Sequence, residues 1–393
     1  MTANHRSSHE IVMETLRSVR TLLGMEVAFI SEFRDGRRIF RYVDSQEGAV
    51  PICVGASDPL EESYCQRVVD GRLPELIRDA TQIPEALSLP ATTALPVGAH
   101  LSVPIRFSDG RIYGTFCCFS TSPENTLNER DIRAMRLFAD VTGKVLEQQV
   151  AEEEARNELL TRLREVLDAE RYTMVYQPII HVAQNKVVGY EALARFSAEA
   201  VRTPDQWFDE AATVELQEEL ELAAIRKALQ GLDYLPDDVY LSLNVSPATL
   251  LKGSVAAVLA GYPFERLMLE VTEHASVNDY SPIAAVLDPM RKRGMRLAVD
   301  DAGAGFASFR HILKLQPDVI KLDLSLIRKI DTDRGCRALA AALIRFAEEM
   351  GSKIVAEGVE TAAELQVLRE LKVNKAQGYL LGRPVPIEAL RER

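Results

Sequence analysis

The chain has 393 residues, of which 47% are hydrophobic and 26% charged, a profile typical of a globular protein with two or three domains. Its formal net charge is −12 and it has no block of Lys and Arg, which argues against binding along a long nucleic acid. No apolar stretch is long enough to span a membrane, and the polar start lacks the apolar core of a signal peptide, so we expect a cytoplasmic protein. Five cysteines without a CxxC pair favour reduced thiols over a disulfide framework or a zinc site.

Residues 1–126 predict an α+β domain. A helical pattern over 11–24 is followed by strand-like runs at 25–33 and 37–43, joined by a turn at Asp35 and Gly36. Two more runs, 100–107 and 111–119, are joined by a second turn that contains Asp109 and Gly110. The pattern indicates an antiparallel sheet with added helices.

Residues 127–170 predict one long helix, with Asn128 able to cap its start. The middle of this segment, at 147–158, is mostly polar, and the acidic run 152–154 is best explained as a solvated face. A helix with so little to bury by itself is expected to pair with its copy in a homodimer. Its apolar face consists of Ile132, Met135, Phe138, Val141 and Val145, and it resumes at Leu159, Leu163 and Val166.

Residues 171–393 alternate apolar runs with helix-length stretches, which is typical of a modified (β/α)8 TIM-like barrel. Only six residues, 181–186, separate the first two runs, too few for a helical crossover, so those two strands should be antiparallel. The eight predicted strands are 174–180, 187–194, 239–245, 267–273, 296–301, 319–323, 353–359 and 375–381.

Polar residues stand at the ends of these runs, where the strands of such a barrel line the mouth that holds active sites. We expect them to converge: five carboxylates (Glu191, Glu270, Asp300, Asp301 and Glu357), the amide of Asn244 and the amine of Lys321. Any one of these acids alone would be better explained as a helix cap or as a ligand of a loop. Because polar residues recur at the ends of successive strands, an active site is the better explanation for the whole set.

So many like charges need compensation, which two divalent cations would supply. The oxygen-only donor set selects Mg²⁺ or Mn²⁺ over Zn²⁺, and Asp300 can bridge the two ions. Two such ions can activate a water and stabilise the leaving oxygen of a phosphoester, and Ca²⁺ should not support this reaction. Lys321 could orient or deprotonate the water, with Asp323 fixing the lysine.

Seven motifs in this region resemble, in order, those of the EAL-domain family, the cyclic di-GMP phosphodiesterases. They are EALAR at 191–195, NVSP at 244–247, EVTE at 270–273, DD at 300–301, KLD at 321–323, AEGVE at 356–360 and QGYLLGRP at 377–384. The resemblance implies hydrolysis of cyclic di-GMP to linear pGpG, with Lys321 beside the attacking water and Arg195 on a substrate phosphate. Gln177 and Gln377 are expected near the dinucleotide. The implied metal ligands are Glu191, Asn244, Glu270, Asp300, Asp301 and Glu357.

One loop departs from the family pattern. The family's DDFGTG is here DDAGAG, so Ala302 and Ala304 replace a phenylalanine and a threonine. These replacements remove no metal ligand, but the loop loses the packing of an aromatic ring and one hydroxyl group. We therefore expect an effect on the order of the loop, on dimer contacts and on the control of activity. Glu273, which matches the usual anchor of this loop, is kept.

Residues 1–126 resemble a GAF domain, through the first helix and the segments at 29–33, 63–80, 98–107 and 113–120. GAF domains commonly sense small ligands or mediate dimerisation, so an unknown ligand or signal is expected here. Two weaker alternatives are a haem bound by His100 and redox sensing by Cys65, which has only Arg67 as a basic neighbour in sequence. The leading hypothesis is an active phosphodiesterase under GAF control. The alternatives are a receptor that binds cyclic di-GMP without cleaving it and a protein-interaction scaffold.

Overall fold

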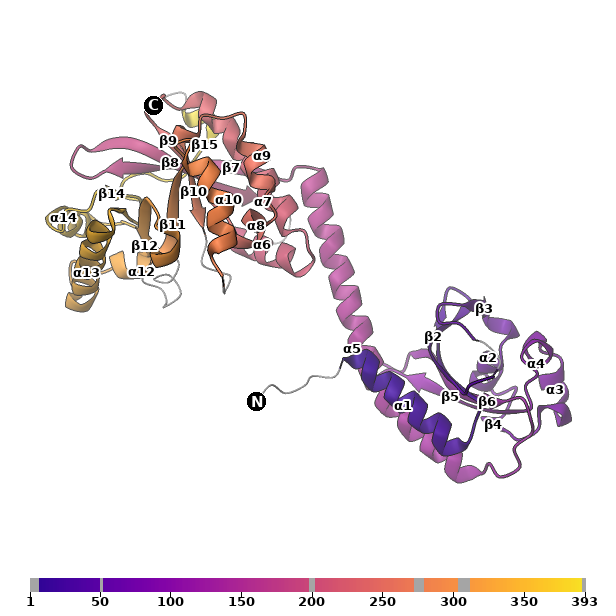
Figure 1. Cartoon of the computed structure of the whole chain (residues 1–393). Helices are drawn as coiled ribbons and strands as arrows, with labels where there is room; N and C mark the ends of the chain where they lie inside the picture. Colours follow the sequence, from indigo (N-terminus) through magenta and orange to yellow (C-terminus); the bar gives the residue numbers. More distant parts are fainter. Residues whose placement is uncertain (1–6, 50–51, 198–201, 272–278, 303–311, 391–393) are drawn as a thin grey trace. The chain divides into compact units, whose positions relative to one another are not determined.

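The structure, a computed structural model, describes residues 7–49, 52–197, 202–271, 279–302 and 312–390, with Asp301 and Ala302 described in their backbone alone. The chain folds as two compact units that divide between Arg156 and Asn157 (Figure 1). Among the described residues, no helix combines the length and the hydrophobicity that crossing a bilayer requires.

The first unit is built on a six-stranded sheet, in the order β3-β2-β1-β6-β5-β4. Every neighbouring pair in this sheet is antiparallel, so the predicted α+β architecture is confirmed. The strands are β1 (Val27–Arg34), β2 (Arg37–Ser45), β3 (Ser57–Pro59), β4 (Leu76–Ile77), β5 (Ala99–Arg106) and β6 (Ile112–Ser120).

Successive residues of a strand point to opposite faces of the sheet. In this sheet both sets are mostly apolar, and helices cover both faces. Phe116 and Cys118 of β6 face α1 (Ser8–Leu23) and the first part of α5 (Glu129–Asp168) (Figure 1). Cys117 and Phe119 face the other layer, which contains α2 (Tyr64–Val69), α3 (Pro84–Leu87) and α4 (Pro90–Ala94), with the short 3₁₀ helices η1 (Leu60–Glu62) and η2 (Ala80–Gln82). The sheet therefore separates two apolar layers.

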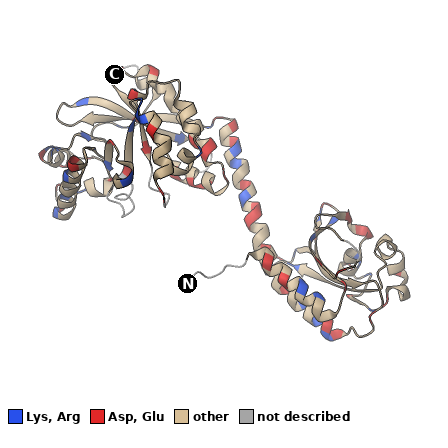
Figure 2. Ribbon diagram, viewed as in Figure 1, with Lys and Arg blue, Asp and Glu red and all other residues tan. Residues whose placement is uncertain are grey.

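The 40-residue helix α5 confirms the predicted long helix, and residues 151–158 in its middle are all exposed. Figure 2 shows acidic and basic residues interspersed along it. Ile132 and Met135 are buried against the sheet of their own chain, so the expectation that they face a partner helix is wrong. Val141 is 51% exposed, and it remains available to a partner together with Leu137, which is 63% exposed.

The second unit is a closed barrel of eight strands, and a short ninth strand, β15, pairs with the first strand of the barrel. Strand β7 (Tyr172–His181) runs antiparallel to β8 (Lys186–Phe196), as predicted, and also to β14, which closes the barrel. The next strands pair in parallel: β9 (Tyr240–Val245), β10 (Leu267–Val271), β11 (Arg296–Ala302), β12 (Val319–Leu322), β13 (Lys353–Ala356) and β14 (Lys375–Ala376). Strand β15 (Val385–Pro386), antiparallel to β7, was not predicted.

The strands pack outward against helices, through residues such as Leu243, Leu269 and Leu297. Their inward residues form a separate apolar layer inside the barrel, which closes the space beneath the mouth: Ile179, Tyr240, Met268, Ala298, Val319 and Val355. The helices are α6 (Pro204–Thr213), α7 (Gln217–Leu229), α8 (Pro247–Leu251), α9 (Ser254–Leu259), α10 (Ser281–Arg291), α12 (Leu324–Ile327), α13 (Arg334–Met350) and α14 (Ala362–Glu370), with η3 (Gln230–Tyr234), η4 (Phe264–Arg266) and η5 (Ile387–Leu390).

Candidate active site

A polar layer lies directly above the apolar layer of the barrel. Because side chains alternate along a strand, the residue two positions after an inward apolar residue also points inward. This relation places Ser242 after Tyr240, Glu270 after Met268, Asp300 after Ala298, Lys321 after Val319 and Glu357 after Val355. The strand register adds Glu191, which lies beside Ser242 and opposite Gln177.

Lys321 occupies the centre of this layer. Its Nζ atom lies 2.5 Å from Oε2 of Glu270 and 2.5 Å from Oε1 of Glu357. Asp300 Oδ1 is 3.3 Å away and Glu191 Oε2 is 3.5 Å away. The structure therefore brings together four of the five predicted carboxylates around the predicted lysine.

Both oxygens of Glu191 accept hydrogen bonds from amide side chains. Asn244 Nδ2 donates to Oε1 at 2.9 Å, and Gln377 Nε2 donates to Oε2 at 2.7 Å. Gln377 Nε2 also lies 3.0 Å from Oε1 of Gln177, so the two predicted glutamines are adjacent to the carboxylates. The Oε1 atom of Gln377 is buried without a hydrogen-bond partner among the described residues, which leaves one acceptor at this site free for a ligand.

Backbone packing fixes the position of Gln377. The residue after it, Gly378, has a φ of 157°, and a Cβ atom there would lie 2.2 Å from the backbone N and O of Val359. Only glycine permits this close approach. The first glycine of QGYLLGRP therefore brings Gln377 to the end of β13 and toward Glu191.

Sequence reasoning missed two polar residues that support this layer. Ser242 is fully buried and donates from Oγ to Oε1 of Glu270 at 2.5 Å. Its position two residues before Asn244 in an alternating strand is a signal that could have identified it. Glu221 on α7 accepts from both the backbone N–H and the hydroxyl of Ser246, at 3.0 and 3.1 Å, and so supports the NVSP motif. The sequence around Glu221 gives no comparable sign of this role, because a glutamate in a charged helical segment is usually exposed to solvent.

Burial and mutual repulsion set the ionisation of the cluster. The pKa of Glu270 is raised to about 8, by burial and by the charge of Glu191. Burial likewise raises the pKa of Glu357, although Lys321 partly opposes this effect. For Glu191 the sign is opposite: burial would raise its pKa, but Lys321 and the Asn244 hydrogen bond lower it. Burial would lower the pKa of Lys321, but the charges of Asp300 and of the other neighbouring carboxylates outweigh burial, so the pKa is raised. One ammonium therefore does not compensate all of these carboxyl groups, and without cations Glu270 tends to keep its proton at neutral pH.

The donor set fits divalent cations. It offers carboxylate and amide oxygens, which Mg²⁺ and Mn²⁺ prefer, and it has more carboxyl groups than one ammonium can compensate. Among the described side chains, no three Asp, Glu, His or Cys residues form a group already arranged to hold an ion. The ammonium of Lys321 lies among the carboxylates instead and provides part of the charge that cations would provide.

The remaining predicted residues lie farther from this centre or outside the described residues. Arg195 is exposed on β8, on the same face of the strand as Glu191, and its Nη1 donates to the carbonyl of Ala194 at 2.8 Å. Asp323 caps α12 by accepting from Ser325 N–H at 2.9 Å, and it is not among the described carboxylates that pair with Lys321. The side chain of Asp301 is not among those that the structure describes, and Glu273 and Ala304 lie outside the described residues.

Comparison with known proteins matches both units of the chain. The EAL domain family matches residues 160–384, more than half of the chain, and the GAF domain family matches residues 5–147. Two relatives from Pseudomonas aeruginosa are each 31% identical: "Cyclic di-GMP phosphodiesterase NbdA" over 58% of this chain, and "Bifunctional diguanylate cyclase/cyclic di-GMP phosphodiesterase MucR" over 59%. These alignments span 31% of NbdA and 36% of MucR, so the chain covers about a third of the length of each relative.

A solved structure shares the barrel. The structure described as "PaMucR Phosphodiesterase, c-di-GMP complex" is 29% identical, with a TM-score of 0.54 over 59% of this chain and 99% of that chain. The family match, the closed barrel with one antiparallel strand and the ordered motifs at its mouth agree. The chain therefore belongs to the EAL domain family, and it carries a GAF domain ahead of its EAL domain.

Proposed function

We propose that the barrel hydrolyses cyclic di-GMP to linear pGpG with two divalent cations, Mg²⁺ or Mn²⁺, and that the GAF domain regulates this reaction. The observation that carries the proposal is the ring of oxygen donors around Lys321, with four carboxylates within 3.5 Å of its Nζ atom. The names of NbdA and MucR, and the ligand of the PaMucR structure, support the choice of substrate.

The residues that would hold the cations are those of the polar layer together with the second of the paired aspartates: Glu191, Asn244, Glu270, Asp300, Asp301 and Glu357. When bound, two such cations supply the positive charge that lowers the pKa of a water and stabilises a leaving oxygen. Asn244 and Gln377 hold both oxygens of Glu191, so this carboxylate cannot swing away from the layer without losing two hydrogen bonds.

Lys321 would orient the attacking water, because its ammonium can only donate hydrogen bonds and the cluster fixes its position. Gln377, whose Oε1 lacks a partner among the described residues, could accept a hydrogen bond from the dinucleotide. Arg195 projects from the same strand face as Glu191 but is solvent-exposed, where its guanidinium can meet a substrate phosphate.

The decisive experiment incubates the purified protein with cyclic di-GMP and either Mg²⁺, Mn²⁺ or Ca²⁺, and identifies the products by chromatography. We expect pGpG with Mg²⁺ or Mn²⁺. Calcium should bind without supporting turnover, because its longer bonds and looser coordination place the water poorly. Full activity with Ca²⁺ alone would contradict the proposed geometry.

The second candidate, a receptor that binds cyclic di-GMP without cleaving it, predicts unchanged dinucleotide in every arm of this experiment but saturable binding by calorimetry. The described carboxylates favour catalysis, since a receptor does not need so many acids around one lysine. We further propose the division into a GAF domain at 1–126, a helical linker at 127–170 and the phosphodiesterase at 171–393.

A further inference from the structure

A second cluster of reactive side chains lies in the first unit, inside the layer between the sheet and α2. Cys65 of α2 and Cys117 of β6 are both fully buried, and their sulfur atoms are 3.4 Å apart. A disulfide has an S–S length of about 2.05 Å, so the two sulfurs need to approach by a little over 1 Å to form a bond. These thiols are 52 residues apart in sequence, and only the fold brings them together.

The two thiols have different surroundings. Arg38 of β2 is buried, and its Nη1 lies 3.2 Å from the sulfur of Cys65. Cys117 instead contacts hydroxyls, with Ser102 Oγ and Thr115 Oγ1 each 3.1 Å from its sulfur. Arg38 is thus a basic neighbour of Cys65 in space, although Arg67 is its basic neighbour in sequence.

Arg67 is engaged elsewhere, in ion pairs with Glu61 and Glu85. Arg38 could not be found from sequence proximity, since it precedes Cys65 by 27 residues and reaches it across the sheet.

The pKa values of Cys65 and Cys117 are shifted in opposite directions by their surroundings. Burial alone would raise the pKa of Cys65, but the Cys117 hydrogen bond and the Arg38 charge lower it to about 5. Burial and the charge of Cys65 raise the pKa of Cys117. Ionisation is thus favoured at the sulfur beside Arg38 and disfavoured at its neighbour, which is the arrangement of an attacking and a resolving cysteine.

We propose that Cys65 and Cys117 are a peroxide-reactive dithiol that closes reversibly to a disulfide, so that the GAF domain is a site of oxidative modification. The Cys65 thiolate attacks a hydroperoxide oxygen and breaks the O–O bond, which gives a sulfenic acid and hydroxide. The Cys117 sulfur then attacks the Cys65 sulfur, its proton leaves with the departing hydroxide as water, and the S–S bond forms. Overall, two thiols and one hydrogen peroxide give one disulfide and two waters. An added dithiol then reduces the protein disulfide back to two thiols and is itself oxidised to a disulfide.

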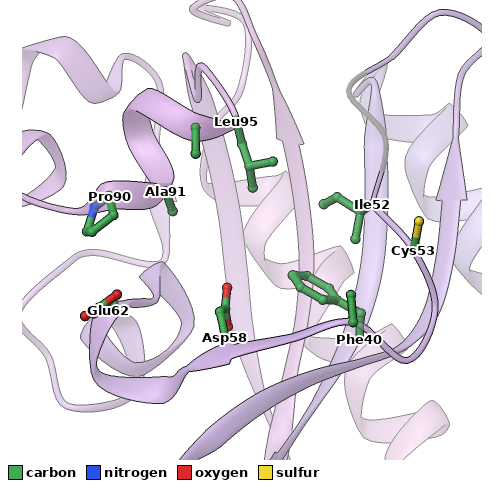
Figure 3. A pocket seen from close by; sticks show the side chains of 10 residues that line it. Phe40, Ile52, Cys53, Asp58, Glu62, Pro90, Ala91 and Leu95 are labelled. Carbon is green, nitrogen blue, oxygen red and sulfur yellow. The ribbon is translucent and has the colours of Figure 1, made fainter.

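A cavity of about 380 Å³ lies near this cluster and is lined by Phe40 and Asp58, both of which contact Arg38 (Figure 3). The Arg38 Nε atom donates to Asp58 Oδ1 at 3.0 Å, and the guanidinium lies 4.6 Å from the ring centre of Phe40. Arg38 thus contacts two residues of the cavity wall as well as the Cys65 sulfur. Disulfide formation removes the negative charge of Cys65 and leaves Arg38 paired with Asp58 alone.

The test uses the full chain with Cys53→Ser and Cys336→Ser, since Cys53 is exposed and Cys336 is partly exposed. The protein is treated with hydrogen peroxide, denatured in the presence of an alkylating agent and mapped by mass spectrometry. We expect one peptide pair joined through Cys65 and Cys117, with the loss of two hydrogens, and its reversal by dithiothreitol. In a Cys117→Ser variant, a sulfenic acid should accumulate at Cys65 and be trapped by dimedone.

Variants of Arg38 and Cys118 provide matched controls. Cys118 neighbours Cys117 but faces the opposite layer, so Cys118→Ser should form the same disulfide at the same rate. Arg38→Lys keeps the positive charge and should still react. Arg38→Met should slow oxidation by about tenfold or more at pH 7, because an ordinary thiol is only a few per cent ionised there.

Two results would overturn the proposal. One is that Cys65 and Cys117 are both alkylated after peroxide treatment of protein whose circular dichroism is native. The other is that Cys118 is oxidised as fast as Cys65. Because the readout is thiol chemistry and not turnover, either result is independent of whether the barrel cleaves cyclic di-GMP.

Discussion

The Nζ atom of Lys321 lies 2.5 Å from Oε2 of Glu270 at a depth where neither residue is more than 1% exposed. The pair spans strands β12 and β10, with Asp300 of β11 between them at 3.3 Å from the same ammonium. Removing one partner of such a buried pair costs about 3–5 kcal/mol, because it leaves a charge uncompensated. Loss of activity in a Lys321 variant would thus mix chemistry with stability, and other positions separate the two better.

Glu191 is the first position to vary, and because it lies in the same buried cluster its stability is measured beside its activity. We expect Glu191→Ala and Glu191→Gln each to lower turnover by about a thousandfold or more, since a carboxylate close to the ions contributes several kcal/mol. The glutamine variant is informative because both oxygens of Glu191 accept from amides, so its NH₂ group would face a donor. Turnover at saturating Mg²⁺ and thermal unfolding are measured in parallel. The control is Glu349→Gln at an exposed site that pairs with Arg345. Wild-type-like turnover in either Glu191 variant would contradict the two-metal assignment.

Two variants of Asp323 distinguish a role in catalysis from a role as the cap of helix α12. Asparagine caps helices about as well as aspartate, so Asp323→Asn should leave thermal stability unchanged, whereas Asp323→Ala should lose about 1 kcal/mol. If Asp323 also acts in catalysis, as predicted from the KLD motif, turnover should fall in the asparagine variant as well. Normal turnover there would assign the residue to the α12 cap alone, where it accepts from Ser325.

Helix α5 is predicted to join two copies of the chain and to transmit the signal. Leu137 and Val141 lie four residues apart and are exposed, so we expect Leu137→Glu with Val141→Glu to weaken the dimer by about tenfold or more. The control is Leu87→Glu, which changes a leucine of similar exposure on α3, in the layer on the other side of the sheet. Analytical ultracentrifugation measures the change. A monomeric wild-type chain at micromolar concentration would rule the dimer out.

The loop after Asp301 is predicted to limit basal activity. Gly303 and Gly305 add conformational freedom that substrate binding must remove, and Ala302 and Ala304 lack the side chains of the family pattern. Ala302→Phe with Ala304→Thr should therefore raise basal turnover and weaken its dependence on the GAF domain. Turnover is compared in the full chain and in a chain without residues 1–156, because a shorter deletion would expose Ile132 and Met135. A drop in both would mean that residues such as Phe306 and Phe309 already pack the loop well.

The Cys65 thiolate should make the stability of the GAF domain depend on pH. Its pKa is about 5 in the folded chain, against about 8.5 for an unfolded thiol. Between these values the unfolded chain binds the extra proton, so this contribution to the free energy of unfolding increases with pH from about 5 to 8.5 and is absent below 5. Urea unfolding under reducing conditions should show this increase in wild type and in Cys118→Ser, but not in Cys65→Ser. Equal pH dependence in all three would contradict the lowered pKa.

The strands and most of the polar layer could be predicted because both depend on local patterns. Each of the eight apolar runs of the barrel overlaps an observed strand, and alternation decides which residues point inward. Strand β15 has two residues, too few for any period, so the sequence carried no sign of it. The contacts of Arg38 with Cys65 and of Glu221 with Ser246 join residues from different elements, and they depend on packing that no short motif encodes.

Strand β7 pairs with β8 on one side and with β14 and β15 on the other. The first strand of the barrel therefore completes its hydrogen bonding only when the last two strands of the chain are present. During synthesis the ribosome must release residues 375–386 before β7 gains its second set of neighbours. Gln377, which holds Glu191, emerges within the same stretch. A nascent chain lacking only its final segment would therefore have the acids of the layer but neither a closed wall around them nor the amide that orients Glu191, so closure of the barrel and completion of the site occur in the same late step.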